Sequence, residues 1–292
     1  MQSNSLSKPF IFGSTGCLGI ALKEALLKEG AILDSHIEGK FKKEFKERGT
    51  AVFDLNAFRN SGYTSVIYAA QSRRYKEFPA GISELTYINT VLPIQFSEIC
   101  SELSIPFVFC STGSVYRSSM DVLNEDSELI SENSLTPYVA SKLFTDLTLI
   151  NKLDKQQLLI FRPFFIYGKG AKSPALFPTL VNMVRNNLEI KLIGVGGLEL
   201  NPISSLDAAR AICFLLKYGK TGVFNLAGLE TVTIRKIATI ISGELDIDVR
   251  FEESEGSEKI LSNQEKLLDT GFNYHSRFEE SFGSFVNNST GK

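Results

Sequence analysis

Short apolar runs alternate with segments of helical periodicity along the chain. The first run, PFIF at 9–12, is followed by IALKEALLKEG at 20–30, in which the apolar residues recur at helical spacing until Gly30. A strand followed by a helix that ends on glycine is the expectation from this pattern. Three glycines lie between the two elements, so the connecting turn contains glycine.

The same alternation continues to the middle of the chain. Further strands are predicted for AVFDL at 51–55, SVIYAA at 65–70, PFVFCS at 106–111 and QLLIFRPF at 157–164, and helices for 88–103 and 141–153. Strands that alternate with helices favour an α/β fold with a doubly wound parallel sheet that is covered on both faces. The length of 292 residues suits one large α/β domain, or a nucleotide-binding domain with a smaller lobe.

Charge and cysteine content narrow the range of partners and compartments. The formal net charge is -2 and charges of both signs are interspersed, so we expect no nucleic-acid partner. The four cysteines are scattered without CxxC spacing, which is typical of reduced thiols in a cytoplasmic protein. The N-terminal stretch is polar, and no apolar run approaches the roughly 18 residues of a membrane span, so no membrane association is predicted.

The first turn carries the motif GSTGCLG, with glycines at 13, 16 and 19. In a turn of this kind the first glycine permits the bend, the second lets the backbone approach a pyrophosphate, and the third lets the helix pack closely. The helix N-terminus then favours negative charge. The motif is compatible with a dinucleotide site and with a purely structural turn.

A second motif, TPYVASKLFTD, places Tyr138 and Lys142 four residues apart at a predicted helix start. Residues at this spacing project from one face of the helix, one turn apart. A phenol with an ordinary pKa of roughly 10 is a poor base at neutral pH, but a neighbouring ammonium stabilises the phenolate. The pair therefore suggests acid/base catalysis, and an ordinary exposed helix pair is the alternative.

A third motif lies where the predicted strand PFVFC runs into hydroxyl residues, in STGSVY at 111–116. Open α/β sheets bind their ligands at the carboxyl ends of the strands. Thr112 is thus placed to hydrogen-bond a substrate oxygen beside Tyr138, whereas Ser111 and Ser114 are also typical turn formers.

Taken in order, these motifs resemble the extended short-chain dehydrogenase/reductase family of NAD(P)-dependent nucleotide-sugar epimerases, dehydratases and reductases. The resemblance covers nearly the whole chain and rests on GSTGCLG, VFDL, VIYAA, YINTVLP, STGSVY, YVASK, FRPFFIYGKG, NPISSLDAARAI, GVFNLAG with TIRKIATII, and LLDTGFNYHSRFEESF. It implies a Rossmann-type doubly wound parallel sheet with a smaller C-terminal substrate-binding lobe. The implied division is an NAD(P)-binding Rossmann domain at 1–164 and a substrate-binding lobe mainly at 165–292, with segments near 200–228 returning to the Rossmann sheet.

The resemblance also implies residue roles. The catalytic residues would be Tyr138 as acid/base, Lys142, which lowers the pKa of Tyr138 and holds the nicotinamide ribose, and Thr112, which polarises the reacting oxygen. The remaining cofactor-binding residues would be Gly13, Ser14, Thr15, Gly16, Cys17, Leu18, Gly19, Asp54, Leu55, Ala69, Ala70, Arg73, Pro163 and Phe164, with Tyr138 and Lys142 in both sets.

The implied reaction is an epimerisation through a keto-sugar, in which the tyrosinate takes a hydroxyl proton while hydride leaves the same carbon. A keto-sugar nucleotide reductase is the alternative, and a non-catalytic NADP(H)-binding regulator or an oxidoreductase for a steroid-like or phenolic substrate are further ones. In dehydratases of the family, the segment at this threonine resembles TDEVYG, with acidic residues directly after the threonine. Here Gly113 and Ser114 follow Thr112, which disfavours dehydration.

Several positions depart from the family pattern. The segment AILDSHI should end near an acid for the adenosine ribose, and His36, Ile37 or Glu38 stands there, depending on the register. Glu38 suits NAD, whereas the nearby lysines at 40, 42 and 43 suit the extra phosphate of NADP. The substrate-side residues are Gln71, Thr112, Phe165 in place of an asparagine, Lys169, and Asn201 near the position of an arginine.

The remaining polar candidates have structural interpretations. His36 and His275 are the only histidines and lack companions, so no metal site is expected. Asp207 is interpreted as an acid that opens a helix. Apolar faces on the helices at 92–103 and 142–153, together with the pairing of relatives through equivalent helices, indicate a homodimer.

Overall fold

Five parallel strands form the central sheet of the computed structural model. The structure describes residues 6–34, 42–44, 51–130, 135–152 and 157–289. The strands are arranged in the order β1-β4-β5-β6-β11, with bounds Pro9–Phe12 for β1, Ser65–Tyr68 for β4, Phe107–Cys110 for β5, Leu158–Pro163 for β6 and Gly222–Leu226 for β11. The predicted parallel sheet is confirmed, and all of its strands end at one edge.

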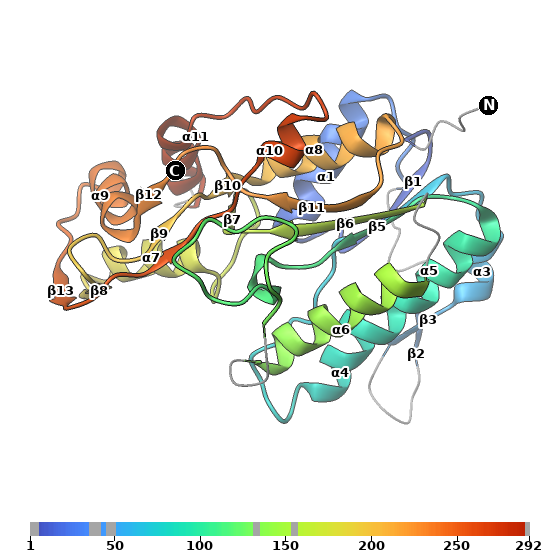
Figure 1. Ribbon diagram of the computed structural model, residues 1–292, viewed down its shortest axis with the longest axis horizontal. Coiled ribbons are helices and arrows are strands. Elements are labelled where there is room, and N and C mark those ends of the chain that lie inside the picture. Colours follow the sequence, from blue (N-terminus) through green and yellow to red (C-terminus); the bar gives the residue numbers. More distant parts are fainter. Residues whose placement is uncertain (1–5, 35–41, 45–50, 131–134, 153–156, 290–292) are drawn as a thin grey trace.

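Helices cover both faces of this sheet (Figure 1). Successive residues of β1 point to opposite faces, so Ile11 joins one apolar cluster while Phe10 and Phe12 join the other. The Ile11 face is covered by α1 (Cys17–Lys28) and α8 (Ser205–Lys217), with α10 (Glu265–Leu268) beside β11. The other face carries α3 (Leu55–Arg59), α5 (Leu92–Leu103) and α6 (Pro137–Lys152). Helix α4 (Ile82–Thr86) and the π-helical turn η1 (Tyr87–Val91) lead directly into α5.

An aromatic cluster fills the second face. Phe96 of α5 is fully buried, and its ring lies within 6 Å of five other aromatic rings, those of Phe10, Phe12, Phe53, Phe58 and Tyr68. Aromatic side chains bury large areas and favour such tilted and edge-to-face contacts. The cluster holds α3 and α5 against the sheet.

The predicted strand AVFDL does not join the central sheet. Its first three residues form β3 (Ala51–Phe53), which pairs antiparallel with β2 (Lys42–Glu44). The Phe53 ring packs into the aromatic cluster, and its backbone N–H donates to the Tyr87 hydroxyl. Residues 31–34 of AILDSHI have no regular structure, and the residues that follow, including His36, Ile37, Glu38 and Lys40, lie outside the described part of the chain.

A second apolar cluster lies beside the carboxyl edge of the sheet, at the left of Figure 1. Its helices are α7 (Leu176–Arg185), α9 (Ile234–Leu245) and α11 (Phe278–Ser289). Its strands pair as β7 (Ile166–Tyr167) with β10 (Ile203–Ser204), β8 (Ile190–Ile193) with β13 (Phe251–Ser254), and β9 (Glu199–Leu200) with β12 (Val232–Thr233) and β14 (Lys259–Ile260).

The chain crosses between the two clusters more than once. It leaves the central sheet after β6, enters the second cluster, and comes back through α8 to β11, which pairs with β6. The division at residue 164 stays a prediction. Among the described helices, none combines the length and apolar character that a membrane crossing requires.

Candidate active site

The carboxyl ends of β1, β4, β5 and β6 lie side by side, and each runs directly into residues singled out by the sequence. The strand registers align Phe12 with Tyr68, and Cys110 with Phe161. Parallel strands present their carboxyl ends at one edge, where open α/β sheets bind ligands. The glycine loop, the segment after Tyr68, Thr112 and Pro163 therefore share this edge.

Two glycines of the first loop are required by close packing. Gly13 has a φ of +95°, and a Cβ there would lie 2.6 Å from the backbone N of Ala70. A Cβ on Gly19 would lie 2.1 Å from the carbonyl oxygen of Gly13. The loop thus packs against the end of β4 and against α1 with no room for a side chain.

The start of α1 fits a bound anion. Its N-cap is Gly16, which supplies no side-chain hydrogen bond to the helix, and no acidic residue lies in the first turn. Thr15 and Gly16 are exposed, so this end of the helix is accessible. Backbone N–H groups and the helix dipole at such an N-terminus favour phosphate. The fit of these residues to a dinucleotide pyrophosphate is therefore good.

Thr112, Tyr138 and Lys142 come together at this edge. Thr112 caps the short 3₁₀ helix η2 (Gly113–Val115), while the other two lie in the first turns of α6. The Thr112 hydroxyl lies near the Tyr138 phenol and favours its ionised form. The Lys142 ammonium donates to the carbonyl oxygens of Cys110 at 2.8 Å and Ala70 at 3.3 Å, at the ends of β5 and β4. The structure thus brings the three predicted catalytic residues together.

Burial sets the ionisation of these groups. Burial raises the pKa of Tyr138 to about 12, against the opposite effect of the hydrogen bond from Thr112. Burial also lowers the pKa of Lys142 to about 8, although Cys110 and Asp146 act in the other direction. At neutral pH the phenol is therefore protonated and the amine is charged but close to its pKa.

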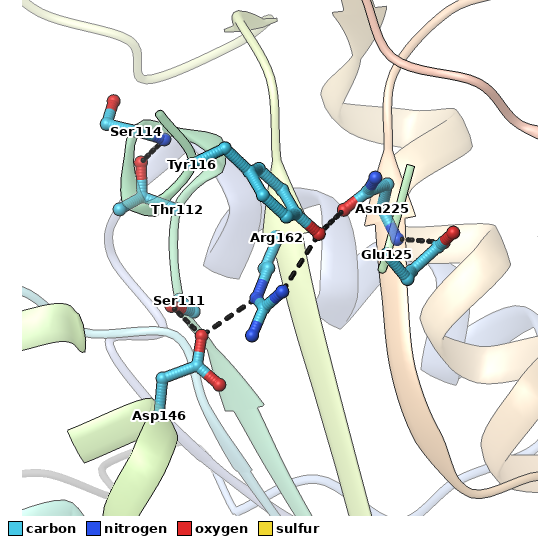
Figure 2. A network of polar contacts seen from close by, with 8 residues as sticks. All are labelled: Ser111, Thr112, Ser114, Tyr116, Glu125, Asp146, Arg162 and Asn225. Atoms are coloured by element: carbon cyan, nitrogen blue, oxygen red, sulfur yellow. Dashed lines mark hydrogen bonds and ion pairs between the residues drawn. The ribbon is translucent and has the colours of Figure 1, made fainter. Parts of the chain in front are cut away.

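A buried polar network joins Asp146 of α6 to the central sheet (Figure 2). Arg162 of β6 donates from Nε to Asp146 Oδ2 at 2.9 Å, and Ser111 donates to the same oxygen. The other side of the guanidinium donates to the Tyr116 hydroxyl, which donates in turn to Asn225 Oδ1 of β11. This network joins α6, which carries Tyr138 and Lys142, to three strands of the sheet.

Asn89, the motif asparagine of YINTVLP, links α6 to the loop after β4. It is fully buried in η1, and its Nδ2 donates to the Ser141 hydroxyl while its Oδ1 accepts from the backbone N–H of Ser72. Thr145 of α6 donates to its carbonyl oxygen. The position of α6 is therefore fixed from a second side.

A pocket of about 340 Å³ opens beside Thr112. It lies between the segment after η2 and strand β14, and its lining is largely apolar, with Arg117 and Lys259 as its cations. Phe165 lines it with a φ of +46°, a left-handed conformation that is uncommon for a bulky residue. The pocket has the size of a small-molecule site and includes Thr112 in its wall.

The other predicted cofactor residues occupy varied positions. Ala69 and Ala70 follow β4 directly, Pro163 ends β6, and Phe164 packs its ring against Gly113. In the first loop and helix, Ser14 is partly buried, Leu18 packs against the core, and burial raises the pKa of the Cys17 thiol to about 11. Asp54 is the N-cap of α3 and Leu55 lies in its first turn. Arg73 is exposed.

The predicted substrate residues are more dispersed. Gln71 is exposed at the end of the β4 segment, while Lys169 lines a separate pocket of about 320 Å³ beside α7. The amide of Asn201 is buried: Nδ2 donates to the carbonyls of Gly228 and Ser262, and Oδ1 accepts from the Ser262 N–H. These bonds tie three segments together, and a substrate contact for Asn201 stays a prediction.

Asp207 also has structural contacts. Ser204, rather than Asp207, is the N-cap of α8, and the Asp207 carboxylate accepts from the backbone N–H groups of His275 and Ser276 and pairs with Arg210. Within the described chain, no group of three or more histidine, cysteine or acidic side chains is arranged to hold a metal ion.

Sequence reasoning did not assign Arg162, Asp146 or Tyr75. An arginine within the apolar run QLLIFRPF was the available signal, because a buried guanidinium requires an acidic partner. Tyr75 gave no such signal, and its ring lies 5.1 Å from that of Tyr138.

The family model for the NAD-dependent epimerase/dehydratase family matches residues 10–227 of this chain. The match spans the glycine loop, the three catalytic candidates and β11. The chain belongs to this family. The resemblance seen in the sequence is thereby confirmed.

Solved structures of similar fold include enzymes of this family. UDP-glucuronic acid 4-epimerase from Bacillus cereus in complex with NAD aligns with a TM-score of 0.78 at 18% identity, over 97% of this chain and 96% of that one. RMD from Pseudomonas aeruginosa, complexed with NADPH, aligns with 0.76 at 17% identity, over 98% and 100%. A dTDP-4-dehydrorhamnose reductase from Clostridium acetobutylicum aligns with 0.76 at 16% identity, over 97% and 99%. At these identities the likeness establishes the fold. No curated protein sequence matches the chain.

Replacing Asp146 with alanine is expected to lower the free energy of unfolding by about 3–5 kcal/mol, because the buried Arg162 guanidinium loses its counter-charge. Urea unfolding followed by circular dichroism measures the loss. The control is Glu128→Ala, which removes the exposed partner of Arg117 and should cost about 1 kcal/mol or less. Equal losses in the two variants would contradict the central place given to the Asp146–Arg162 pair.

Proposed function

We propose that the protein is an NAD(P)-dependent nucleotide-sugar epimerase that works through a keto-sugar intermediate. The observation that carries the proposal is the grouping of Thr112 with Tyr138 and Lys142, the last two one helical turn apart, at the same sheet edge as the glycine loop. Family membership and the likeness to nucleotide-sugar epimerases and reductases support it.

Each catalytic residue has a definite task in this reaction. Tyr138 Oη takes the proton of a sugar hydroxyl and later returns it, while the Thr112 hydroxyl orients the same sugar oxygen. The nicotinamide ring of bound NAD(P) supplies the hydride acceptor and donor. The Lys142 ammonium stabilises the phenolate of Tyr138 and holds the cofactor ribose. With a pKa of about 12, the Tyr138 phenol is almost entirely protonated at neutral pH. The positive charge of Lys142 is therefore proposed to favour the phenolate.

The residues proposed to hold the cofactor are the 13–19 loop, Ala69, Ala70, Pro163 and Phe164, with Asp54, Leu55 and Arg73 further along. The cofactor is proposed as NAD, with NADP as the alternative. Substrate contacts are proposed for Thr112, Gln71, Phe165 and Lys169. An apolar pocket wall with cations at Arg117 and Lys259 suits a sugar bearing a phosphorylated nucleotide.

Dehydration is disfavoured on steric grounds as well as chemical ones. A Cβ on Gly113 would lie 2.7 Å from the Phe164 ring, so an acidic side chain does not fit directly after Thr112. Ser114 supplies no carboxyl group either. The elimination step of a dehydratase, which needs an acid and a base here, thus lacks its residues.

A keto-sugar nucleotide reductase is the second candidate. It needs the same three residues, since it runs only the return half of the epimerase cycle. A solved dTDP-4-dehydrorhamnose reductase from Clostridium acetobutylicum aligns over nearly the full chain and favours keeping it. A non-catalytic NADP(H)-binding regulator is disfavoured because Tyr138 and Lys142 are both present and in contact with the catalytic edge.

The two reactions are distinguished by incubating the protein with NAD and UDP-, dTDP-, GDP- or CDP-sugars, or with NADPH and the corresponding 4-keto-sugars. Epimerisation gives a new sugar nucleotide on chromatography with no net change at 340 nm.

Tyr138→Phe should lower turnover by about 10²–10⁴-fold, because it removes the proton acceptor, and should leave NADH affinity within about threefold. Equal turnover in wild type and Tyr138→Phe would overturn the proposal.

The ionisation of Lys142 should appear in the pH dependence of cofactor binding. The pKa of Lys142 lies near 8, and we expect the charged form to bind the ribose. Above pH 8 the free protein must take up a proton on binding, so NADH affinity should fall by up to about tenfold per pH unit. Fluorescence titration between pH 6.5 and 9.5 measures it. Lys142→Met should bind weakly with a flat profile, and a flat wild-type profile would argue against the assigned role.

A homodimer is proposed on the basis of the outer face of α5, η1 and α6. Phe144, Leu147, Leu103 and Val91 are between 39% and 58% exposed there. Burying these side chains against a second copy would be favourable. Light scattering at micromolar concentration should give twice the chain mass of 32.3 kDa, and Phe144→Glu should give the monomer mass. A monomeric wild type would contradict the dimer.

A further inference from the structure

Tyr75 lies against the phenol that the proposed reaction uses. It belongs to the 69–81 segment, which follows β4 and leads to α4. Its ring centroid is 5.1 Å from that of Tyr138, and the two ring planes meet at 55°. Such tilted packing is a favourable aromatic contact. Tyr75 is itself partly buried, and this burial raises the pKa of its phenol, so it is neutral at physiological pH.

The segment that carries Tyr75 is held firmly at its base. The Ser72 hydroxyl donates to Glu84 Oε1 of α4 at 2.7 Å, and the backbone N–H of Arg73 donates to the same oxygen. The Ser72 N–H donates to Asn89, which also binds Ser141 of α6. The base of the segment and the catalytic helix thus share one buried asparagine.

The far side of the segment is held as well. A Cβ on Gly81 would lie 2.4 Å from the carbonyl oxygen of Arg74, so the segment folds closely back on itself. Lys76 Nζ lies 5.8 Å from the centre of the Tyr75 ring and donates to the carbonyl of Pro174, just before α7, at 3.4 Å. The residue next to Tyr75 thus links this segment to the chain that enters α7, while Tyr75 itself contacts Tyr138 of α6.

The groups around Tyr138 come from several elements. The Thr112 hydroxyl approaches from η2, the neutral Tyr75 phenol from the 69–81 segment, and Lys142 lies one turn along α6. The nearby acids are engaged elsewhere: Glu84 of α4 with Ser72, and Asp146 of α6 with Arg162. Tyr75 is thus the aromatic side chain in contact with Tyr138.

We infer that Tyr75 is a positioning residue of the reaction centre, whose ring holds the Tyr138 ring in place beside Thr112 and covers it from solvent. The inference rests on the proposed function only for the catalytic use of Tyr138. The work is done by the ring rather than by the hydroxyl of Tyr75, so phenylalanine should replace it and alanine should not.

The first test needs no substrate. The chain contains no tryptophan, so tyrosinate absorbance near 295 nm is free of indole signal. Each protein is titrated with and without the additional substitution Tyr138→Phe. The difference between the two absorbance curves is the ionisation of Tyr138. Stopped-flow pH jumps read it before the chain unfolds. Tyr75→Ala should lower the pKa of Tyr138 by about one unit or more, because water reaches the phenol.

Two variants serve as controls. Tyr75→Phe keeps the ring and should leave the ionisation of Tyr138 within a few tenths of a unit. Tyr218→Ala removes an exposed tyrosine on the far helix α8 and should change nothing. Where Tyr75→Ala unfolds, Tyr75→Leu takes its place, with the same expected shift. An alanine or leucine variant that titrates like wild type would overturn the inference, as would a Tyr75→Phe variant that shifts as much as Tyr75→Ala.

A second readout uses turnover. Tyr75→Ala should lower kcat about 10–100-fold and move the ascending limb of the pH profile to lower pH, while Tyr75→Phe retains most of the rate. NADH affinity should stay within about threefold in both, since Tyr75 acts through Tyr138. If Tyr138→Phe turns over like wild type, the proposed function fails, but the absorbance titration still decides whether Tyr75 controls Tyr138.

Discussion

The buried ion pair of Arg162 and Asp146 is the interaction on which the catalytic edge depends. A charge inside a protein must be paired, so the side chain of β6 and that of α6 fix each other's position. Tyr138 and Lys142 lie on the same helix as Asp146, and Ser111, which also binds Asp146, is next to Thr112. One carboxylate thereby sets the place of the helix that carries Tyr138 and Lys142 relative to the strand end that carries Thr112.

Around this pair the backbone segments pack closely, and few polar side chains lie at the carboxyl edge of the sheet. Gly13 and Gly19 let the first loop lie directly on β4 and α1, and Gly113 leaves room for the Phe164 ring. Lys142 reaches the carbonyl ends of two strands, where burial keeps its pKa near 8. The site thus offers an anion-binding helix end, a neutral phenol and a readily titrated ammonium within one edge, which suits hydride transfer coupled to proton transfer.

Local patterns predicted much of this arrangement from the sequence. The glycine turn lies within one loop, and Tyr138 and Lys142 lie within one helix, so residue spacing alone predicts their geometry. The partner of Arg162 and the contact of Tyr75 with Tyr138 depend on packing between distant segments, which periodicity does not encode. The same holds for β3, whose apolar residues predict a strand but whose antiparallel pairing with β2 is a tertiary outcome. The three backbone hydrogen bonds of the Asn201 amide are likewise formed with distant segments, which the sequence does not show.

The central claim is that this edge holds NAD through a closed redox cycle. Denaturing the purified protein and identifying the released small molecules by mass spectrometry tests it most directly. The account predicts one equivalent of NAD per chain, because an epimerase returns the hydride to its own substrate and has no need to exchange its cofactor. A protein that releases no nicotinamide nucleotide would contradict the epimerase and leave the reductase, which exchanges NADPH at every turnover, as the better description.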